Sequence, residues 1–285
     1  MGESGQTAPT TTDPARYFPV SARPYRMTVG LSAFGTDFGN GARDGQYFQR
    51  DRDAEHYRRA KAAVPLGRYR VLDGDDERRA CHAAVLAWMA ATLRREHPEL
   101  LDASEPSYAS IAQVVQEDFA VVRRGPHGRD EAIAVFVAFP SGWRPETIAG
   151  AGFKQIHGPV PGFAENDPAI ASMLASMIER GPYVRFVWTI TADDHLDHHP
   201  EEGRREAWRD GGDGWLRVER QVTVPFPAVG ASLFLIRTYL YPFAMLGSEQ
   251  RDTLAYALAR MPAEIASYKG LNESARRIAE RLRNS

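Results

Sequence analysis

The chain has 285 residues, of which 43% are hydrophobic and 25% are charged. These values are ordinary for a globular protein, and the length allows a core that encloses a ligand pocket. The formal net charge of −2 lacks the basic excess that is typical of nucleic-acid-binding proteins. Cys81 is the only cysteine in the sequence, which excludes an intrachain disulfide and a cysteine cluster for zinc or an iron–sulfur centre.

The N-terminus has no basic start followed by an apolar run, so no secretion signal is predicted. No window approaches the roughly 20 apolar residues that span a bilayer. We therefore expect a soluble, cytoplasmic protein that does not enter the membrane. Residues 1–15 are rich in Thr, Ser, Gly and Pro and are predicted to be a disordered tail. Residues 16–285 contain no repeat and no similar linker, and are predicted to form one domain.

The first half of the chain predicts helices followed by two strands. Residues 34–52 are rich in Gly, Asp and Arg, which favours irregular structure. Apolar residues at helical spacing predict a helix over 75–96, and Ser104 is suited to begin a second helix. Strands are predicted over 119–123 and 132–139. The latter strand is apolar on both sides, so we expect it at the centre of the sheet.

The second half predicts three strands enclosed by helices. The expected helices cover 168–180, 248–261 and 272–282, and the expected strands cover 183–191, 215–224 and 232–241. Strands that are grouped together and flanked by helices indicate an α+β fold with a mostly antiparallel sheet.

Alternation along the last two strands places one arginine on an otherwise apolar face of each, Arg220 and Arg237. A buried arginine is costly unless it is paired with an anion. One explanation is a structural ion pair, for which Glu117 and Asp118 are candidate acids. The other is contact with the carboxylates of a bound ligand.

Four blocks of sequence occur in a characteristic order and spacing. They are YRMTVGL at 25–31, VQEDFAVV at 115–122, AFPSGWRPE at 138–146 with GFKQIHGPVPG at 152–162, and LRVERQVTVPFPAVGASLFLIRTYLYPF at 216–243. Together these blocks resemble the family of haem-dependent oxidative N-demethylases. The resemblance implies a PAS-like fold, with a mostly antiparallel sheet flanked by helices, that encloses a pocket for haem b. It also implies oxidative removal of a methyl group from a secondary amine, with O2 and externally supplied electrons.

His157 is the candidate axial ligand of the haem iron. Prolines at 159 and 161 stiffen the backbone after it, and Gly158 leaves room for a flat ligand. A neutral imidazole on a rigid loop in apolar surroundings is what a haem iron requires of its proximal ligand. The local residues alone leave open a loop histidine that is hydrogen-bonded to the backbone; the resemblance favours the ligand.

Haem propionates need cationic or hydrogen-bonding partners. The strand arginines Arg220 and Arg237 are candidates, and Lys154 and Arg144 are alternatives near His157. For the two strand arginines, a structural ion pair within the protein remains an alternative to propionate binding.

Three further residues are candidates for catalysis. Glu117 and Asp118 are adjacent, so a strand points them to opposite faces, and one could bind a substrate ammonium or relay a proton. The alternative is that one acid is solvated and the other is paired structurally. Glu219, beside Arg220, is a weaker candidate for the same roles. Tyr239 could donate a hydrogen bond into a pocket, or belong to the core.

The chain departs from the family at Val187. The family usually carries an asparagine before the tryptophan of this strand, whereas this chain has Phe186, Val187 and Trp188. A polar group is thus missing from a position that could face the pocket. This puts dimethylamine, the family's substrate, in doubt and makes a larger or different amine plausible.

The histidines and aspartates of residues 193–199 resemble a metal site at first sight. They follow a strand in a polar segment, and no second cluster of ligands completes them. We therefore expect a solvated loop.

The sequence has no Walker loop, no strand–GxGxxG–helix unit and no G-x-S-x-G elbow, so we expect no nicotinamide or flavin of its own. An oxygenase would then take electrons from a separate reductase or a small reductant. The leading hypothesis is a haem-dependent monooxygenase that attacks either an N-methyl carbon or the nitrogen of an amine. The alternative is a PAS-like haem sensor. This alternative is disfavoured because no output domain is recognised in the sequence. A haem-free relative is disfavoured by the presence of His157.

Overall fold

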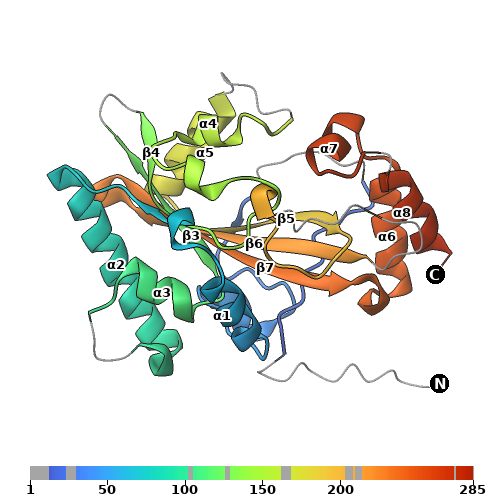
Figure 1. Cartoon of the computed structure of the whole chain (residues 1–285), viewed down its shortest axis with the longest axis horizontal. Coiled ribbons are helices and arrows are strands. Elements are labelled where there is room, and N and C mark those ends of the chain that lie inside the picture. The colour runs from blue at the N-terminus through green and yellow to red at the C-terminus, as the bar shows by residue number, and fades with distance from the viewer. Residues whose placement is uncertain are drawn as a thin grey trace.

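One antiparallel sheet organises the molecule (Figure 1). The computed structural model describes residues 13–23, 30–101, 105–125, 129–161, 168–202, 208, 214–272 and 274–284. In this part of the chain, seven strands follow the order β1-β5-β6-β7-β3-β4-β2, and all neighbours are antiparallel. The strands are β1 (Ser32–Ala33), β2 (Arg70–Val71), β3 (Asp118–Arg124), β4 (Asp130–Phe136), β5 (Tyr183–Thr191), β6 (Trp215–Phe226) and β7 (Ala231–Pro242).

The described helices surround this sheet. They are α1 (Ala54–Ala62), α2 (Asp76–Glu96), α3 (Tyr108–Val114), α4 (Phe153–His157), α5 (Pro168–Glu179), α6 (Ser248–Ala259), α7 (Ala263–Tyr268) and α8 (Ser274–Arg283). None of these described helices has the length and apolarity needed to cross a membrane. The α+β class with an antiparallel sheet, predicted from the sequence, is confirmed.

Different helices cover the two faces of the sheet. On one face, which we call the α2 face, Val222 of β6 and Leu235 of β7 pack with Met89 of α2. Leu216 and Val218, which lie on the same face of β6 nearer its N-terminal end, pack against α6 and α8. On the opposite face, called the α4 face, Phe234 of β7 packs with residues of α4 and α5. Because side chains alternate along a strand, odd-numbered residues of β5 and β6 and even-numbered residues of β7 belong to the α4 face.

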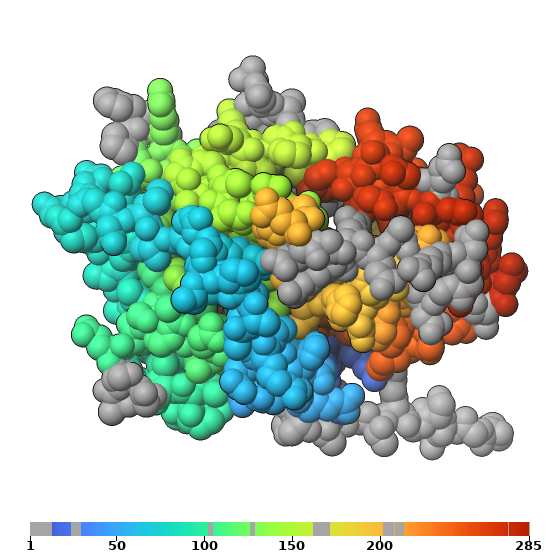
Figure 2. All heavy atoms as spheres, in the orientation of Figure 1, coloured from blue at the N-terminus to red at the C-terminus, as the bar shows by residue number. Residues whose placement is uncertain are grey.

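Helices α4 and α5 lie on one side of the strands and α2 and α3 on the other (Figure 1). The space-filling view shows the yellow-green surface around α4 adjoining the red surface of α7 on the same face of the molecule (Figure 2).

Two local predictions need correction. Ser107, not Ser104, caps α3: its hydroxyl accepts a hydrogen bond from the Ser110 main-chain nitrogen. A residue before proline avoids the helical region, so Glu105 cannot precede Pro106 within a helix. Strand β4 is not central, because only the two-residue β2 separates it from the sheet edge. It is apolar on both sides because the adjacent residues Ala134 and Val135 belong to hydrophobic clusters on opposite faces.

Some predicted features lie outside the described residues. These are residues 1–12 of the predicted tail, residues 25–29 of the first sequence block, Ser104, and residues 126–128 of the turn between β3 and β4. Within the described part, Ala15 is buried and its carbonyl accepts a hydrogen bond from the Tyr241 hydroxyl.

The buried charges of the α2 face have structural partners. Arg237 forms an ion pair with Asp51 at 2.8 Å, and both side chains are at most 3% exposed. Arg220 donates hydrogen bonds to the main-chain carbonyls of Asp44 and Gln46. The arginines are paired within the protein, but the partners are not Glu117 or Asp118, as expected. Residues 44–51 lie over this face and provide the acceptors instead.

We predict that Asp51→Ala destabilises the fold by about 3–5 kcal/mol, because removal of the acid leaves Arg237 charged and buried without its ion-pair partner. Urea denaturation followed by circular dichroism would measure the change. Glu55→Ala is the matched control, since the Glu55–Arg58 pair is exposed and should contribute nothing measurable. Equal urea midpoints for Asp51→Ala and the wild type would contradict the prediction.

Candidate functional site

His157 is the last residue of α4, the short helix that packs on the α4 face. The sequence predicted a rigid loop, whereas the histidine stands at a helix end. Its Nδ1 lies 2.9 Å from the carbonyl oxygen of Phe153, one helical turn earlier. A carbonyl only accepts, so Nδ1 carries the proton and Nε2 carries the lone pair. Iron-ligating histidines use this arrangement, in which one ring nitrogen donates to the protein and the other binds the metal.

The surroundings of His157 favour the neutral imidazole. Burial lowers the pKa of His157 below its usual value of 6.5; the carbonyl of Phe153 opposes this, and the positive charge of Arg185 adds to it. A neutral ring is required for metal ligation, because a protonated ring has no lone pair. His157 therefore has the protonation state that a ligand needs at neutral pH.

Apolar side chains adjoin the ring. The Phe153 ring lies against His157 with centroids 4.0 Å apart. Phe153 in turn packs with Met173 and Met177 of α5 and with Phe234 of β7. A neutral imidazole beside apolar and thioether side chains fits the requirements of a haem.

Beyond Phe234, the α4 face carries a row of partly exposed residues at the centre of the sheet. We call these residues the exposed strip: Arg185, Val187 and Thr189 of β5, Glu219 and Gln221 of β6, and Ile236 of β7. Their neighbours of opposite parity on β6 and β7, such as Val222 and Arg237, are buried. The strip joins the His157 environment through Arg185, which is close enough to lower the pKa of His157.

The strip contains polar atoms in defined positions. The Glu219 carboxylate lies 3.5 Å from Nε of Arg217 and accepts a hydrogen bond of 3.2 Å from the Gln221 amide. The hydroxyl of Thr189 is buried and has no hydrogen-bond partner in the described part of the chain. Polar groups that are buried without partners are costly, and a bound ligand is one way to satisfy them.

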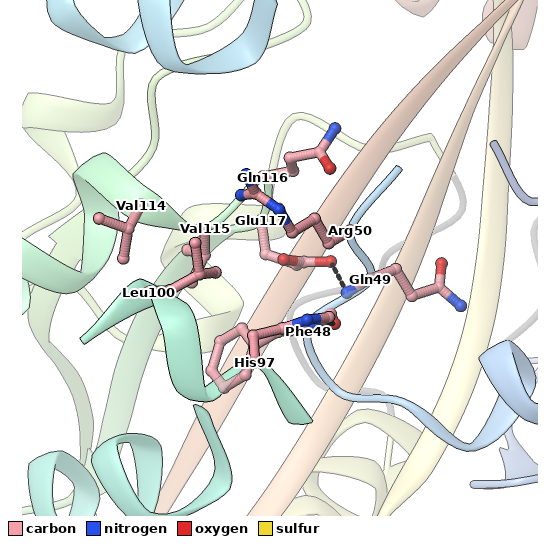
Figure 3. Close-up of a pocket in the computed structure, with 9 residues that line it drawn as sticks. All are labelled: Phe48, Gln49, Arg50, His97, Leu100, Val114, Val115, Gln116 and Glu117. Atoms are coloured by element: carbon pink, nitrogen blue, oxygen red, sulfur yellow. Dashed lines mark hydrogen bonds between the residues drawn. The ribbon is translucent and has the colours of Figure 1, made fainter. Parts of the chain in front are cut away.

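The structure does not bring the predicted catalytic acid Glu117 to His157. Glu117 is 1% exposed and accepts a 2.8 Å hydrogen bond from the main-chain nitrogen of Gln49. Burial raises its pKa, an effect that Arg237 and the Gln49 nitrogen oppose. It lines a small pocket together with Arg50 and His97, shown in Figure 3.

Asp118 and Tyr239 are likewise engaged in the core. Asp118 is 2% exposed, pairs with Lys61 at 3.3 Å and accepts a hydrogen bond from the Phe139 main-chain nitrogen. Tyr239 is 2% exposed on the α2 face, and its hydroxyl donates to the Gln49 side chain. Tyr239 thus belongs to the core, as its alternative interpretation proposed, whereas neither Glu117 nor Asp118 is the solvated acid that the alternative for these two residues expected.

The predicted propionate partners divide into two groups. Arg220 and Arg237 lie on the α2 face, so the sheet separates them from His157. Lys154 is exposed on α4, one turn before His157. Arg144 forms an exposed ion pair with Glu201 at 2.8 Å. Of the four, Lys154 remains a candidate by position.

Sequence reasoning missed Arg185 and underrated Glu219. The strand alternation that singled out Arg220 and Arg237 also places Arg185, Glu219 and Gln221 together on the other face. That face contains more polar residues, as a solvent-facing surface does, and the packing of α4 and α5 on part of it makes these residues candidates for the site.

The expectation of a solvated loop at residues 193–199 is wrong. His198 pairs with Asp193 at 2.7 Å, Asp197 pairs with Arg68 at 2.8 Å, and all four side chains are buried.

His199 lies close to Glu146 and Glu201, a grouping compatible in spacing with a metal ion. However, His199 Nδ1 accepts a hydrogen bond from the Glu201 main-chain nitrogen, and its Nε2 lies 3.1 Å from Glu146. The proton is therefore on Nε2, and neither ring nitrogen offers a lone pair to a cation.

One protein family matches the chain over residues 78–279; its description is haem-dependent oxidative N-demethylase, alpha subunit-like. The matched region begins in α2, ends in α8, and includes both His157 and the exposed strip. This match confirms the resemblance found in the sequence.

We predict that His157 titrates below pH 6.5 in the haem-free protein and that Arg185→Gln raises its pKa, because a neighbouring positive charge is removed. Imidazole nitrogen chemical shifts followed by NMR would report both the pKa and the tautomer. Arg144→Gln, which removes an exposed arginine on a different segment, serves as the control. A pKa at or above 6.5, or no response to Arg185→Gln, would contradict this description of the site.

Proposed function

This chain belongs to the haem-dependent oxidative N-demethylase, alpha subunit-like family, and we propose that it binds haem b through His157 and oxidises an amine with O2. The observation that carries the proposal is the state of His157. Its proton is directed to the Phe153 carbonyl, its pKa is lowered by burial, and it lies on a matched segment of the chain.

The residues that would hold the haem lie on α4, α5 and β7, within the PAS-like arrangement that we propose for the pocket. His157 would provide the nitrogen that binds the iron, and Phe153, Met177 and Phe234 would form an apolar wall. Lys154 and Arg185 are the cations positioned to meet propionates, since both are near His157 and neither lies on the α2 face. The haem, when bound, provides the O2 chemistry that side chains do not supply.

The protein's own residues would orient the substrate and exclude water. The apolar cluster around Phe153 limits water at the His157 side, and the exposed strip offers both polar and apolar contacts to a small amine. Val187 lies on this strip, which supports a substrate other than dimethylamine.

The overall reaction at an N-methyl carbon would consume one O2, two electrons and two protons. It would release formaldehyde, water and the amine shortened by one methyl group. Oxygen insertion at nitrogen would have the same demand for O2 and electrons and would give a hydroxylamine and water. A separate reductase subunit or a small reductant would supply the electrons.

We predict that His157→Ala lowers haem retention at least tenfold, because the iron loses its protein ligand. Haem content per polypeptide, from the Soret absorbance after gel filtration, is the measurement. His195→Ala is the matched control, since His195 is exposed. Circular dichroism of both variants would establish folding, and added imidazole should restore a Soret band to His157→Ala. Full haem loading of His157→Ala with an unchanged spectrum would overturn the assignment.

An oxygenase and a haem sensor differ in turnover. We predict that the haem-loaded protein, given a reductant and O2, releases formaldehyde from a panel of N-methylated secondary amines. The His157→Ala variant with equal total haem controls for reactions of free haem. Stable binding of O2 or carbon monoxide without formaldehyde or an N-oxidised product would favour the sensor.

A further inference from the structure

Glu219 occupies the centre of the exposed strip. Its side chain is 18% exposed, and its cross-strand neighbours are Val187 on β5 and Thr238 on β7. Thr238 is buried and binds Arg217, while Val187 is apolar and partly exposed. The carboxylate therefore adjoins one apolar surface that remains accessible.

The protein fixes this carboxylate from two sides. Arg217 Nε lies 3.5 Å from one oxygen, and the Gln221 amide donates to the other at 3.2 Å. Arg217 is itself held, because its terminal nitrogens donate to the carbonyls of Leu196 and Phe139. The geometry of a carboxylate held in this way is set before a ligand arrives.

The fixed carboxylate has unused capacity. Two carboxylate oxygens provide about four acceptor positions, and the hydrogen bond from the Gln221 amide, the one described to this carboxylate, uses one of them. Tyr268 of α7, which is 46% exposed, lies near enough that the charge of Glu219 contributes to raising the pKa of its phenol, after the larger effect of burial. The Tyr268 phenol of α7 and the residues of the exposed strip are therefore both in the surroundings of Glu219.

We propose that Glu219 binds the ammonium group of the amine substrate and that Val187 contacts the apolar substituent on the nitrogen. This inference rests on the proposed function and names the substrate class: a protonated secondary amine with an N-methyl group and a larger apolar substituent. A carboxylate and an ammonium form charge-assisted hydrogen bonds, which are stronger than neutral ones. The apolar Val187 side chain makes no such bond and favours a hydrocarbon group beside it.

Binding of the ammonium form also selects the reacting atom. A protonated nitrogen has no lone pair to accept oxygen, so the C–H bonds of the adjacent methyl group are the remaining site of attack. With O2 as oxidant and a two-electron reductant, hydroxylation of that carbon converts R–NH2⁺–CH3 into R–NH2⁺–CH2OH and water. Its collapse gives R–NH3⁺ and formaldehyde. Glu219 thereby directs the reaction to carbon and away from nitrogen.

The test compares two ligands of similar shape, N-methylbenzylamine and the neutral benzyl methyl ether. Each is titrated into haem-loaded wild type and Glu219→Gln by calorimetry and by the absorption difference spectrum. We expect Glu219→Gln to raise the Kd of the amine at least tenfold and to leave the Kd of the ether within twofold, because only the amine uses the charge. Glu249→Gln, an exposed change on α6, is the matched control and should alter neither.

An equal Kd of the amine in wild type and Glu219→Gln would overturn the inference, as would a parallel loss of both ligands or no binding of the amine by the wild type. Haem content is read from the same samples. A wild type that takes up no haem contradicts the proposed function, while calorimetry of the haem-free protein still decides whether Glu219 distinguishes amine from ether.

Discussion

The strict alternation of side chains along β5, β6 and β7 is the constraint on which the rest of the structure depends. It divides the charged residues of three adjacent strands between two environments. Arg220 and Arg237 enter the α2 face, where carbonyls and Asp51 satisfy them. Arg185 and Glu219 enter the α4 face, where part of the surface stays open. A shift of one residue in register would exchange these sets and place the structural arginines beside His157.

Helix α4 places a histidine on one side of this division. It ends at His157, and its turn supplies the Phe153 carbonyl that fixes the imidazole tautomer. Burial then lowers the pKa of the ring, so that one short helix sets its orientation, tautomer and charge together. Among the described residues, α4 and α5 pack at the Phe234 end of their sheet face, and we propose that the rows around Glu219 bind the smaller ligand.

The sequence predicts the class of fold and most elements, because long amphipathic helices and alternating strands leave clear periodic signals. Strand β5 has the predicted bounds, and β6 and β7 are extended by one or two residues at their ends. Contacts between distant segments are not local signals. The partner of Arg237, Asp51, comes from a stretch that resembled plain loop, and buried partners on other segments, such as Arg68, hold residues 193–199 in place. His157 could be predicted from its block, whereas Arg185 and Glu219 required knowledge of which face α4 covers.

We propose that His157 and this face of the sheet would hold a haem, which would supply the O2 chemistry. The most direct measurement is the absorption spectrum of the wild-type protein expressed with haem supplied, recorded before and after dithionite and then carbon monoxide. Our account predicts a Soret band that shifts on reduction and shifts again with carbon monoxide. A colourless protein that takes up no haem would contradict it.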